Sequence, residues 1–215
     1  MTTKSRSGSV LTDPDGRLAR PVAGVDEAGR GPLAGPVVAA AVVAPDGWVL
    51  RGLDDSKKLS ETVRRGLASI IRSDPELSWG VGWATAEEID SLNILQATFL
   101  AMRRALEGLG KSPAAIVVDG NRCIPGLDLP QMAVVEGDGK ILSIAAASIL
   151  AKTARDSWMV EQEPLHPGYG FSIHKGYPTP RHLEALDRLG PCALHRTSFA
   201  PVRRCLARSS GGRIL

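Results

Sequence analysis

The sequence contains few cysteines, few aromatic residues and no long apolar segment. Its three cysteines are far apart and form no CxxC pair, which argues against a cysteine metal site and favours reduced thiols in the cytoplasm. No apolar run approaches the roughly 20 residues that span a membrane, and the N-terminus has no apolar signal-peptide core. We therefore expect a soluble, cytoplasmic protein without a membrane partner.

The chain is long enough to bury a sizeable core. Its 215 residues are 43% hydrophobic and 23% charged, which is typical of one soluble domain. We expect a flexible lead-in over residues 1–20, one domain over residues 21–205 with a helical part from about residue 163, and a flexible basic tail over residues 206–215. The net charge of +3 permits a polyanionic partner without requiring one.

Residues 21–43 carry most of the chemical information. Two apolar runs of strand length flank a connection rich in Gly and Pro. Asp26 and Glu27 follow the first run, where a solvated hairpin end would explain the two acids alone. The next residues, Gly29-Arg30-Gly31, add a cation between glycines that let the chain bend and let a ligand approach the backbone. This combination favours a site for a metal or an anion.

Hydrophobic periodicity along the rest of the chain predicts a mixed sheet with helices packed on it. Residues 163–177, rich in Pro, Gly and His, are predicted to form a loop. The predicted strands cover residues 22–25, 37–43, 79–84, 114–118 and 132–135. The predicted helices cover residues 60–71 with Ser60 as cap, 86–90 with Thr85 as cap, 94–109, 141–160 and 180–189.

Further acids follow patterns that would bring them to the same place. Asp119 stands, like Asp26, at the carboxyl end of an apolar run, and two parallel strands would deliver both acids to one edge of the sheet. Ser148, Lys152 and Asp156 are spaced four apart on the long predicted helix and share one face. An Asx-turn would also explain Asp119, and a surface ion pair would also explain Asp156.

Carboxylates gathered at one edge would repel one another unless a cation joined them. All of these candidate ligands are oxygens, and no His or Cys stands beside them at metal spacing. Such a donor set selects Mg²⁺ or Mn²⁺ over Zn²⁺. Two such ions would suit phosphoryl chemistry, because they can clamp the attacking and the leaving oxygens.

Short motifs follow one another in order between about Val22 and Arg204. They are Val25-Asp-Glu-Ala-Gly-Arg-Gly-Pro-Leu-Ala-Gly35, Asp55-Ser-Lys-Lys-Leu59, Val118-Asp-Gly-Asn121, Ser143-Ile-Ala-Ala-Ala-Ser-Ile-Leu-Ala-Lys152, Arg155-Asp156 and His174-Lys-Gly-Tyr-Pro-Thr179. Each is weak alone, but the ordered set closely resembles the type 2 ribonuclease H family, ribonuclease HII. The resemblance implies an α/β, ribonuclease-H-like mixed β-sheet flanked by helices, with a C-terminal helical extension.

The resemblance also implies an activity. It is endonucleolytic hydrolysis of the RNA strand of RNA–DNA hybrids, with incision 5′ of single ribonucleotides embedded in duplex DNA, leaving 5′-phosphate and 3′-hydroxyl ends. By the family pattern, two Mg²⁺ or Mn²⁺ ions would be held, with substrate bound, by the catalytic acids Asp26, Glu27, Asp119 and Asp156. Gly29-Arg30-Gly31 would read the ribose 2′-OH and the scissile phosphate, and Tyr177 would lie against the deoxyribose on the 3′ side. Further candidates for substrate contact, which solvation or packing would also explain, are Lys57, Ser148 and Lys152.

The sequence departs from the family pattern in two places. Thr197 stands where the family more often has a basic residue, and residues 1–20 have no counterpart that we can place.

A nucleotide-binding module is disfavoured because the Gly-rich segment is not GxxxxGK[ST]. A non-catalytic hybrid-binding protein on the same fold is the alternative, although a pure binder has little reason to gather carboxylates where phosphates lie. We expect a monomer whose partners are RNA–DNA hybrids and ribonucleotide-containing DNA.

Overall fold

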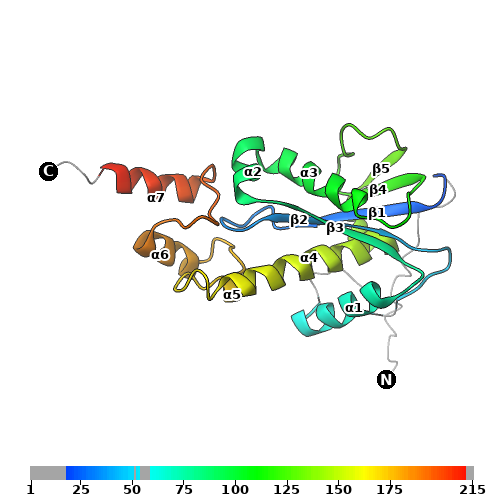
Figure 1. Ribbon diagram of the computed structural model, residues 1–215, viewed down its shortest axis with the longest axis horizontal. Coiled ribbons are helices and arrows are strands. Elements are labelled where there is room, and N and C mark those ends of the chain that lie inside the picture. The colour runs from blue at the N-terminus through cyan, green and yellow to red at the C-terminus, as the bar shows by residue number, and fades with distance from the viewer. Residues whose placement is uncertain (1–17, 51, 54–58, 212–215) are drawn as a thin grey trace, which may run out of the picture.

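The computed structural model describes residues 18–50, 52–53 and 59–211. Most of the predicted lead-in, the end of the predicted tail and the candidate Lys57 lie outside these ranges. The described strands form one five-stranded sheet in the order β3-β2-β1-β4-β5 (Figure 1). Their bounds are β1 Val22–Ala28, β2 Val37–Val43, β3 Ser78–Ala84, β4 Ala115–Asp119 and β5 Gln131–Val134. The sheet is mixed, as predicted, because β2 is antiparallel to β1 and β3 while β4 is parallel to β1 and β5.

Small side chains let the central strands pack closely against the helices. β2 consists of Val and Ala alone and is buried along its whole length, as expected of a strand that is covered on both faces. A Cβ atom at Gly24 would lie 2.3 Å from the carbonyl carbon of Ser143, so only glycine allows this approach of the long helix to β1. The strand that carries Asp26 is therefore held directly against that helix.

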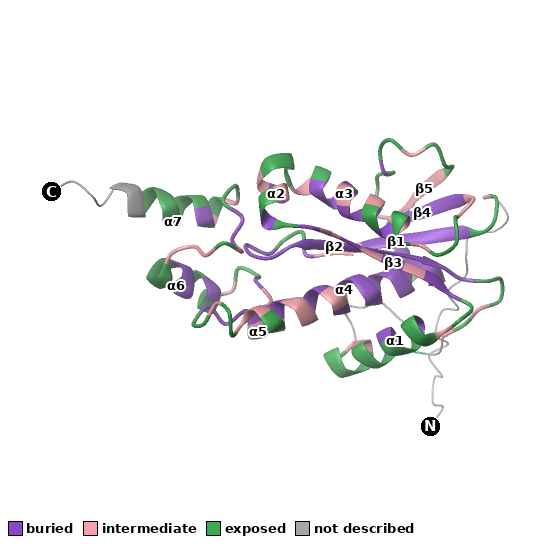
Figure 2. Cartoon of the chain, in the orientation of Figure 1, coloured by how far each residue is buried: buried purple, intermediate pink, exposed green. Residues whose placement is uncertain are grey.

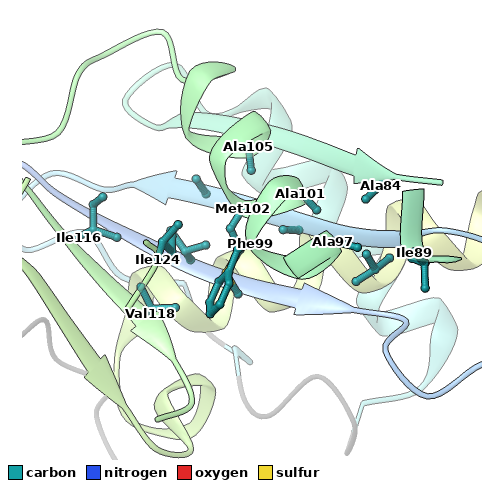
Figure 3. Packing of buried hydrophobic residues seen from close by; sticks show 14 residues of the cluster. Ala84, Ile89, Ala97, Phe99, Ala101, Met102, Ala105, Ile116, Val118 and Ile124 are labelled. Carbon is teal, nitrogen blue, oxygen red and sulfur yellow. The ribbon is translucent and has the colours of Figure 1, made fainter. Parts of the chain in front are cut away.

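Helices cover both faces of the sheet (Figure 1). On one face, Phe99 and Met102 of α3 pack with Ile116 of β4 and with Ile124, as Figure 3 shows. The other face is covered by α4, against which α1 packs, and the strands between the two layers are largely buried (Figure 2). The predicted caps Ser60 and Thr85 are confirmed. The helices are α1 Glu61–Ser73, α2 Ala86–Leu92, α3 Ile94–Glu107 and α4 Leu142–Gln162.

A C-terminal helical extension follows α4, as the family resemblance implied. It consists of α5 Phe171–His174, α6 Pro180–Leu189 and α7 Ala200–Gly211. The prediction of an uninterrupted loop over residues 163–177 was wrong, because α5 lies within it. The first residues of the predicted tail, 206–211, belong to helix α7. Within the described ranges, no helix combines the length and the apolar character that crossing a membrane requires.

The departure at Thr197 has a structural explanation. Its amide and its hydroxyl both donate to Asp90 Oδ2 at 2.7 Å, and the amide and hydroxyl of Ser198 donate to Asp90 Oδ1. These bonds hold the pKa of Asp90 below its usual value although partial burial opposes them. The segment before α7 is thus fastened to α2.

Candidate active site

Two strands deliver carboxylates to the same edge of the sheet. The parallel register pairs Val25 of β1 with Val118 of β4. Asp26 and Asp119, each the next residue on its strand, therefore stand at equivalent positions. The parallel pairing on which the prediction depended is confirmed.

The candidate residues from distant parts of the sequence line one cleft of about 240 Å³. β1 and the loop after it supply one wall, β4 supplies an acid, and α4 and the loop after α5 supply the rest. The cleft contains all of the candidates except Asp156 and the undescribed Lys57. Its lining is Asp26, Glu27, Ala28, Gly29, Arg30, Gly31, Asp119, Ser148, Lys152 and Tyr177.

Asp26 is the most deeply buried acid of this cleft, with 5% of its surface exposed. Burial raises the pKa of Asp26 well above its usual value, and the charges of Glu27 and Asp119 raise it further. Hydrogen bonds from the Ser148 side chain and the Glu27 amide, the latter 2.7 Å from Oδ1, favour the ionised form and oppose this shift. The three carboxylates are thus close enough to disfavour simultaneous ionisation.

The other two acids of the cleft are also held by polar contacts. Glu27 Oε1 accepts a hydrogen bond from Arg30 Nη1 at 3.3 Å. Asp119 Oδ1 accepts one from the Gly137 amide at 2.7 Å, at the start of the 3₁₀ turn Gly137–Gly139. These contacts orient the two carboxylates at the strand ends.

Asp156 lies at the edge of the cleft, outside its lining. It is buried on α4, with Oδ1 2.8 Å from Lys152 Nζ and Oδ2 3.9 Å from Arg64 Nη2. Lys152, which bonds Asp156, itself lines the cleft with the other acids. Within the described residues, no group of three or more His, Cys, Asp or Glu side chains is arranged to hold a metal ion.

The two glycines beside Arg30 have different environments. Gly29 has a φ of 96°, and a Cβ atom there would lie 2.1 Å from Arg155 Nε, so the fold itself requires glycine. At Gly31 a Cβ atom would meet only Tyr177 Cε1, at 3.8 Å, which is an ordinary contact. Gly31 therefore leaves open space in the cleft, whereas the fold itself does not require glycine at this position.

Tyr177 lines the cleft beside Gly31 of this loop. Its side chain is partly exposed, and its ring centroid is 5.6 Å from Lys152 Nζ and 5.7 Å from Arg155 Cζ. Cations at such distances from a ring face are attracted by its quadrupole. Tyr177 therefore presents a supported aromatic surface beside Gly31.

Sequence reasoning did not predict the burial of two arginines next to the cleft, Arg155 and Arg196. Arg155 donates to the carbonyl oxygens of Ala34, Pro36 and Lys175 at 3.0–3.1 Å, which ties the loop after β1 to the loop that carries Tyr177. Burial lowers the pKa of Arg155 to about 10. The sequence signal that could have indicated the burial of Arg155 was its position on the apolar predicted helix 141–160, next to the candidate Asp156.

The donor set of the cleft fits a hard divalent cation. Its acids offer only carboxylate oxygens, and no His or Cys of the described chain lines it. Burial is the main cause of the raised pKa of Asp26, and the charges of Glu27 and Asp119 add to it, so a bound cation would favour the ionised carboxylate.

Comparison with known proteins gives one family. The Ribonuclease HII family model matches residues 23–202. A ribonuclease HII of Laribacter hongkongensis is 58% identical over 191 residues, which cover 88% of this chain and 96% of that protein. The crystal structure of ribonuclease H2 from Pyrococcus horikoshii OT3 has a TM-score of 0.72 and 29% identity, covering 87% of this chain and 97% of that one. Bst-RNase HIII in complex with Mn²⁺ shares the fold, with a TM-score of 0.70 at 18% identity over 88% of this chain and 70% of that one.

Proposed function

The chain belongs to the ribonuclease HII family, and from this premise we propose that it hydrolyses the RNA strand of RNA–DNA hybrids and incises duplex DNA 5′ of single embedded ribonucleotides. Membership makes it a ribonuclease H, a metal-dependent nuclease. One observation carries the finer proposal. A single cleft combines three carboxylates with an open glycine at Gly31 and an aromatic ring at Tyr177, so the candidate metal ligands lie beside a surface that would suit a sugar.

The cleft acids Asp26, Glu27 and Asp119 would hold Mg²⁺ or Mn²⁺, two ions with substrate bound, and Asp156 would join them once Lys152 turns away. The ions would supply an activated water and stabilise the departing 3′-oxygen, leaving 5′-phosphate and 3′-hydroxyl ends. The protein orients two of these acids itself, because the Ser148 hydroxyl bonds Asp26 and the Gly137 amide bonds Asp119.

Recognition of the ribonucleotide would fall to the loop after β1. The 2′-OH both donates and accepts, and it is the group that distinguishes a ribonucleotide within DNA. Gly31 leaves room for a sugar to approach the backbone, and Arg30 supplies an exposed guanidinium 3.3 Å from Glu27. Tyr177, beside Gly31, would lie against the next deoxyribose. Lys152 would face the phosphate, and Lys57 stays a candidate contact.

The cytoplasmic location of the protein stays a prediction. The structure joins no two of the three cysteines by a disulfide; Cys123 is exposed, Cys192 is half-buried and Cys205 is buried. This agrees with the reduced thiols that favoured a cytoplasmic location. The monomeric state is likewise a prediction, which sedimentation equilibrium would test.

A labelled duplex with one ribonucleotide, incubated with Mg²⁺, Mn²⁺ or EDTA beside an all-DNA duplex, tests the function. We expect incision 5′ of the ribonucleotide with either metal, and none with EDTA or in the all-DNA duplex. Asp119→Asn, prepared identically, reveals any contaminating nuclease and should not cut. Binding without incision under both metals would favour the non-catalytic alternative, and incision at other positions would refute the proposed recognition.

A further inference from the structure

Arg196 is completely buried beneath the loop that follows β1. Its Nη2 donates to the Gly29 carbonyl at 2.6 Å, Nη1 to the Arg30 carbonyl at 3.0 Å and Nε to the Gly35 carbonyl at 2.9 Å. All of these donors end on carbonyl oxygens rather than on a carboxylate. The guanidinium therefore spans both ends of the loop and is the common partner of its inward-facing oxygens.

Further contacts hold Arg196 itself in place. Its amide donates to the Leu33 carbonyl at 2.8 Å, and its guanidinium carbon lies 5.1 Å from the ring centroid of Phe199. Burial, and next the charge of Arg155, lower the pKa of Arg196. The protein thus buries a cation at an electrostatic cost here, and the several carbonyl bonds offset that cost.

The direction of these carbonyls determines where the neighbouring amides point. In a trans peptide the C=O and the following N–H point in opposite directions, and within the described residues the only cis peptide bond is Arg20-Pro21. Because the Gly29 and Arg30 oxygens turn inward to Arg196, the amides of Arg30 and Gly31 turn away from it. Both residues line the cleft, and within the described chain neither amide donates a hydrogen bond.

We propose that Arg196 is a positioning residue of the active site, whose buried guanidinium turns the Gly29 and Arg30 peptides so that two consecutive N–H groups face the substrate. Successive amides that point into one concavity bind phosphate or hydroxyl oxygen well. Arg196 touches no substrate in this arrangement and acts through the backbone. The C-terminal extension therefore contributes to recognition from beneath the loop. This inference deepens the proposed function and rests on it for its catalytic consequence.

Arg196→Lys tests the proposal because lysine keeps the charge but cannot bond three carbonyls in one plane. The matched control is Arg203→Lys, the same substitution at an exposed position of α7. Residual dipolar couplings of the ¹⁵N-labelled proteins report the Arg30 and Gly31 N–H directions without any need for activity. Cleavage of the single-ribonucleotide duplex reports the consequence, and melting curves ensure that each variant is assayed well below its melting temperature. Arg196→Gln, which removes the buried charge, is the second variant should Arg196→Lys not fold.

We expect Arg196→Lys to change the couplings of these two amides and to lower kcat/KM on the single-ribonucleotide duplex roughly 10- to 100-fold, as for loss of a preorganised backbone donor. Mn²⁺ binding should stay within about twofold, because the cleft acids are untouched, and Arg203→Lys should match the wild type throughout. Unchanged couplings in a folded Arg196 variant would overturn the proposal. If the wild type does not cut the single-ribonucleotide duplex, the proposed function fails. The couplings alone then decide the role of Arg196.

Discussion

Lys152 Nζ lies 2.8 Å from Asp156 Oδ1. Lys152 lines the cleft, whereas Asp156 is the only described candidate acid outside its lining. The pair is separated by one turn of α4, and little of either side chain is exposed. The same ammonium also lies 5.6 Å from the Tyr177 ring centroid, so Lys152 contacts both Asp156 and the aromatic ring that lines the cleft. An ion that binds Asp156 through Oδ1 would compete with this ammonium.

Replacing Lys152 with methionine should destabilise the protein without metal and increase its response to metal. Removal of the ammonium leaves a buried carboxylate with only a distant cation, which costs about 1–3 kcal/mol of unfolding free energy in EDTA. Mn²⁺ should then raise the melting temperature of Lys152→Met more than that of the wild type. Lys140→Met is the matched control, because Lys140 pairs with Glu136 at the same spacing on an exposed surface. An equal Mn²⁺ response in Lys152→Met and the wild type would contradict the exchange.

Asp26→Asn should stabilise the protein in EDTA near pH 8 and abolish cleavage in Mn²⁺. The pKa of Asp26 is raised in the folded state, so its favourable contribution is complete below about pH 3.9 and is lost as the pH rises through the raised value. The neutral amide avoids this loss, and each kcal/mol gained should raise the melting temperature by roughly 2–4 °C. Melting curves from pH 4.5 to 8.5 measure the difference, which should shrink toward acid pH. The exposed Asp187→Asn should show no such trend, and a constant difference for Asp26→Asn would show that Asp26 does not titrate with a raised pKa.

Gly29→Ala and Gly31→Ala should separate a requirement of the fold from a requirement of the substrate. At Gly29 the new Cβ meets Arg155 at a positive φ, so the melting temperature should fall by several degrees, following a loss of about 1–3 kcal/mol. At Gly31 the only neighbour is Tyr177 at 3.8 Å, so the melting temperature should stay near that of the wild type. Cleavage at a single ribonucleotide should nevertheless fall roughly tenfold or more in Gly31→Ala, because misplacement near the reacting atoms is costly. Wild-type kinetics for Gly31→Ala would show that the substrate does not approach this position.

The sequence predicted the sheet and the acids because both depend on local patterns. Apolar runs that end in Asp26 and Asp119 indicate buried strands, and one assumption, parallel pairing, was enough to bring the two acids together. The role of Arg196 could not be predicted in this way, since the carbonyls that it bonds lie 161–167 residues earlier in the chain. Asp156 was predicted on the correct helix, and a surface ion pair was offered as an explanation for it; the structure shows the pair with Lys152, but with both side chains largely buried, which spacing alone does not give.

The histidines illustrate the same limit, because their positions in the sequence show no common spacing. In the structure His182 Nε2 lies 3.1 Å from His195 Nε2, and the His182 and His174 rings stack with centroids 4.3 Å apart. His182 Nδ1 is also 3.0 Å from the Tyr177 carbonyl oxygen. This buried histidine cluster, His174, His182 and His195, therefore supports the loop that carries Tyr177.

Acid should weaken this support. Burial lowers the pKa of His182 and of His195 to about 4; the charge of His174 lowers the pKa of His182 further, and the charge of His182 lowers that of His195 further. A base with a lowered folded pKa binds fewer protons when folded, so its stabilising contribution is lost as the pH falls from about 6.5 through 4. A hydrogen bond between the two Nε2 atoms also requires one of them to be unprotonated. We therefore expect the melting temperature to fall between pH 7 and pH 5, and to fall less in His195→Gln than in the wild type.

His166→Gln is the comparison for this prediction, because His166 is half-exposed and lies outside the histidine cluster and affects it only through its charge, which is a minor cause of the lowered pKa of His195. His195→Gln should start from a lower melting temperature at pH 7, since it loses the contact with His182 and the bond from the Cys192 amide to Nδ1. The slope with pH, rather than the starting value, therefore reports the titration. If His195→Gln and the wild type lose stability in parallel on acidification, the buried histidines do not titrate in this range, and carboxylates elsewhere account for the acid sensitivity.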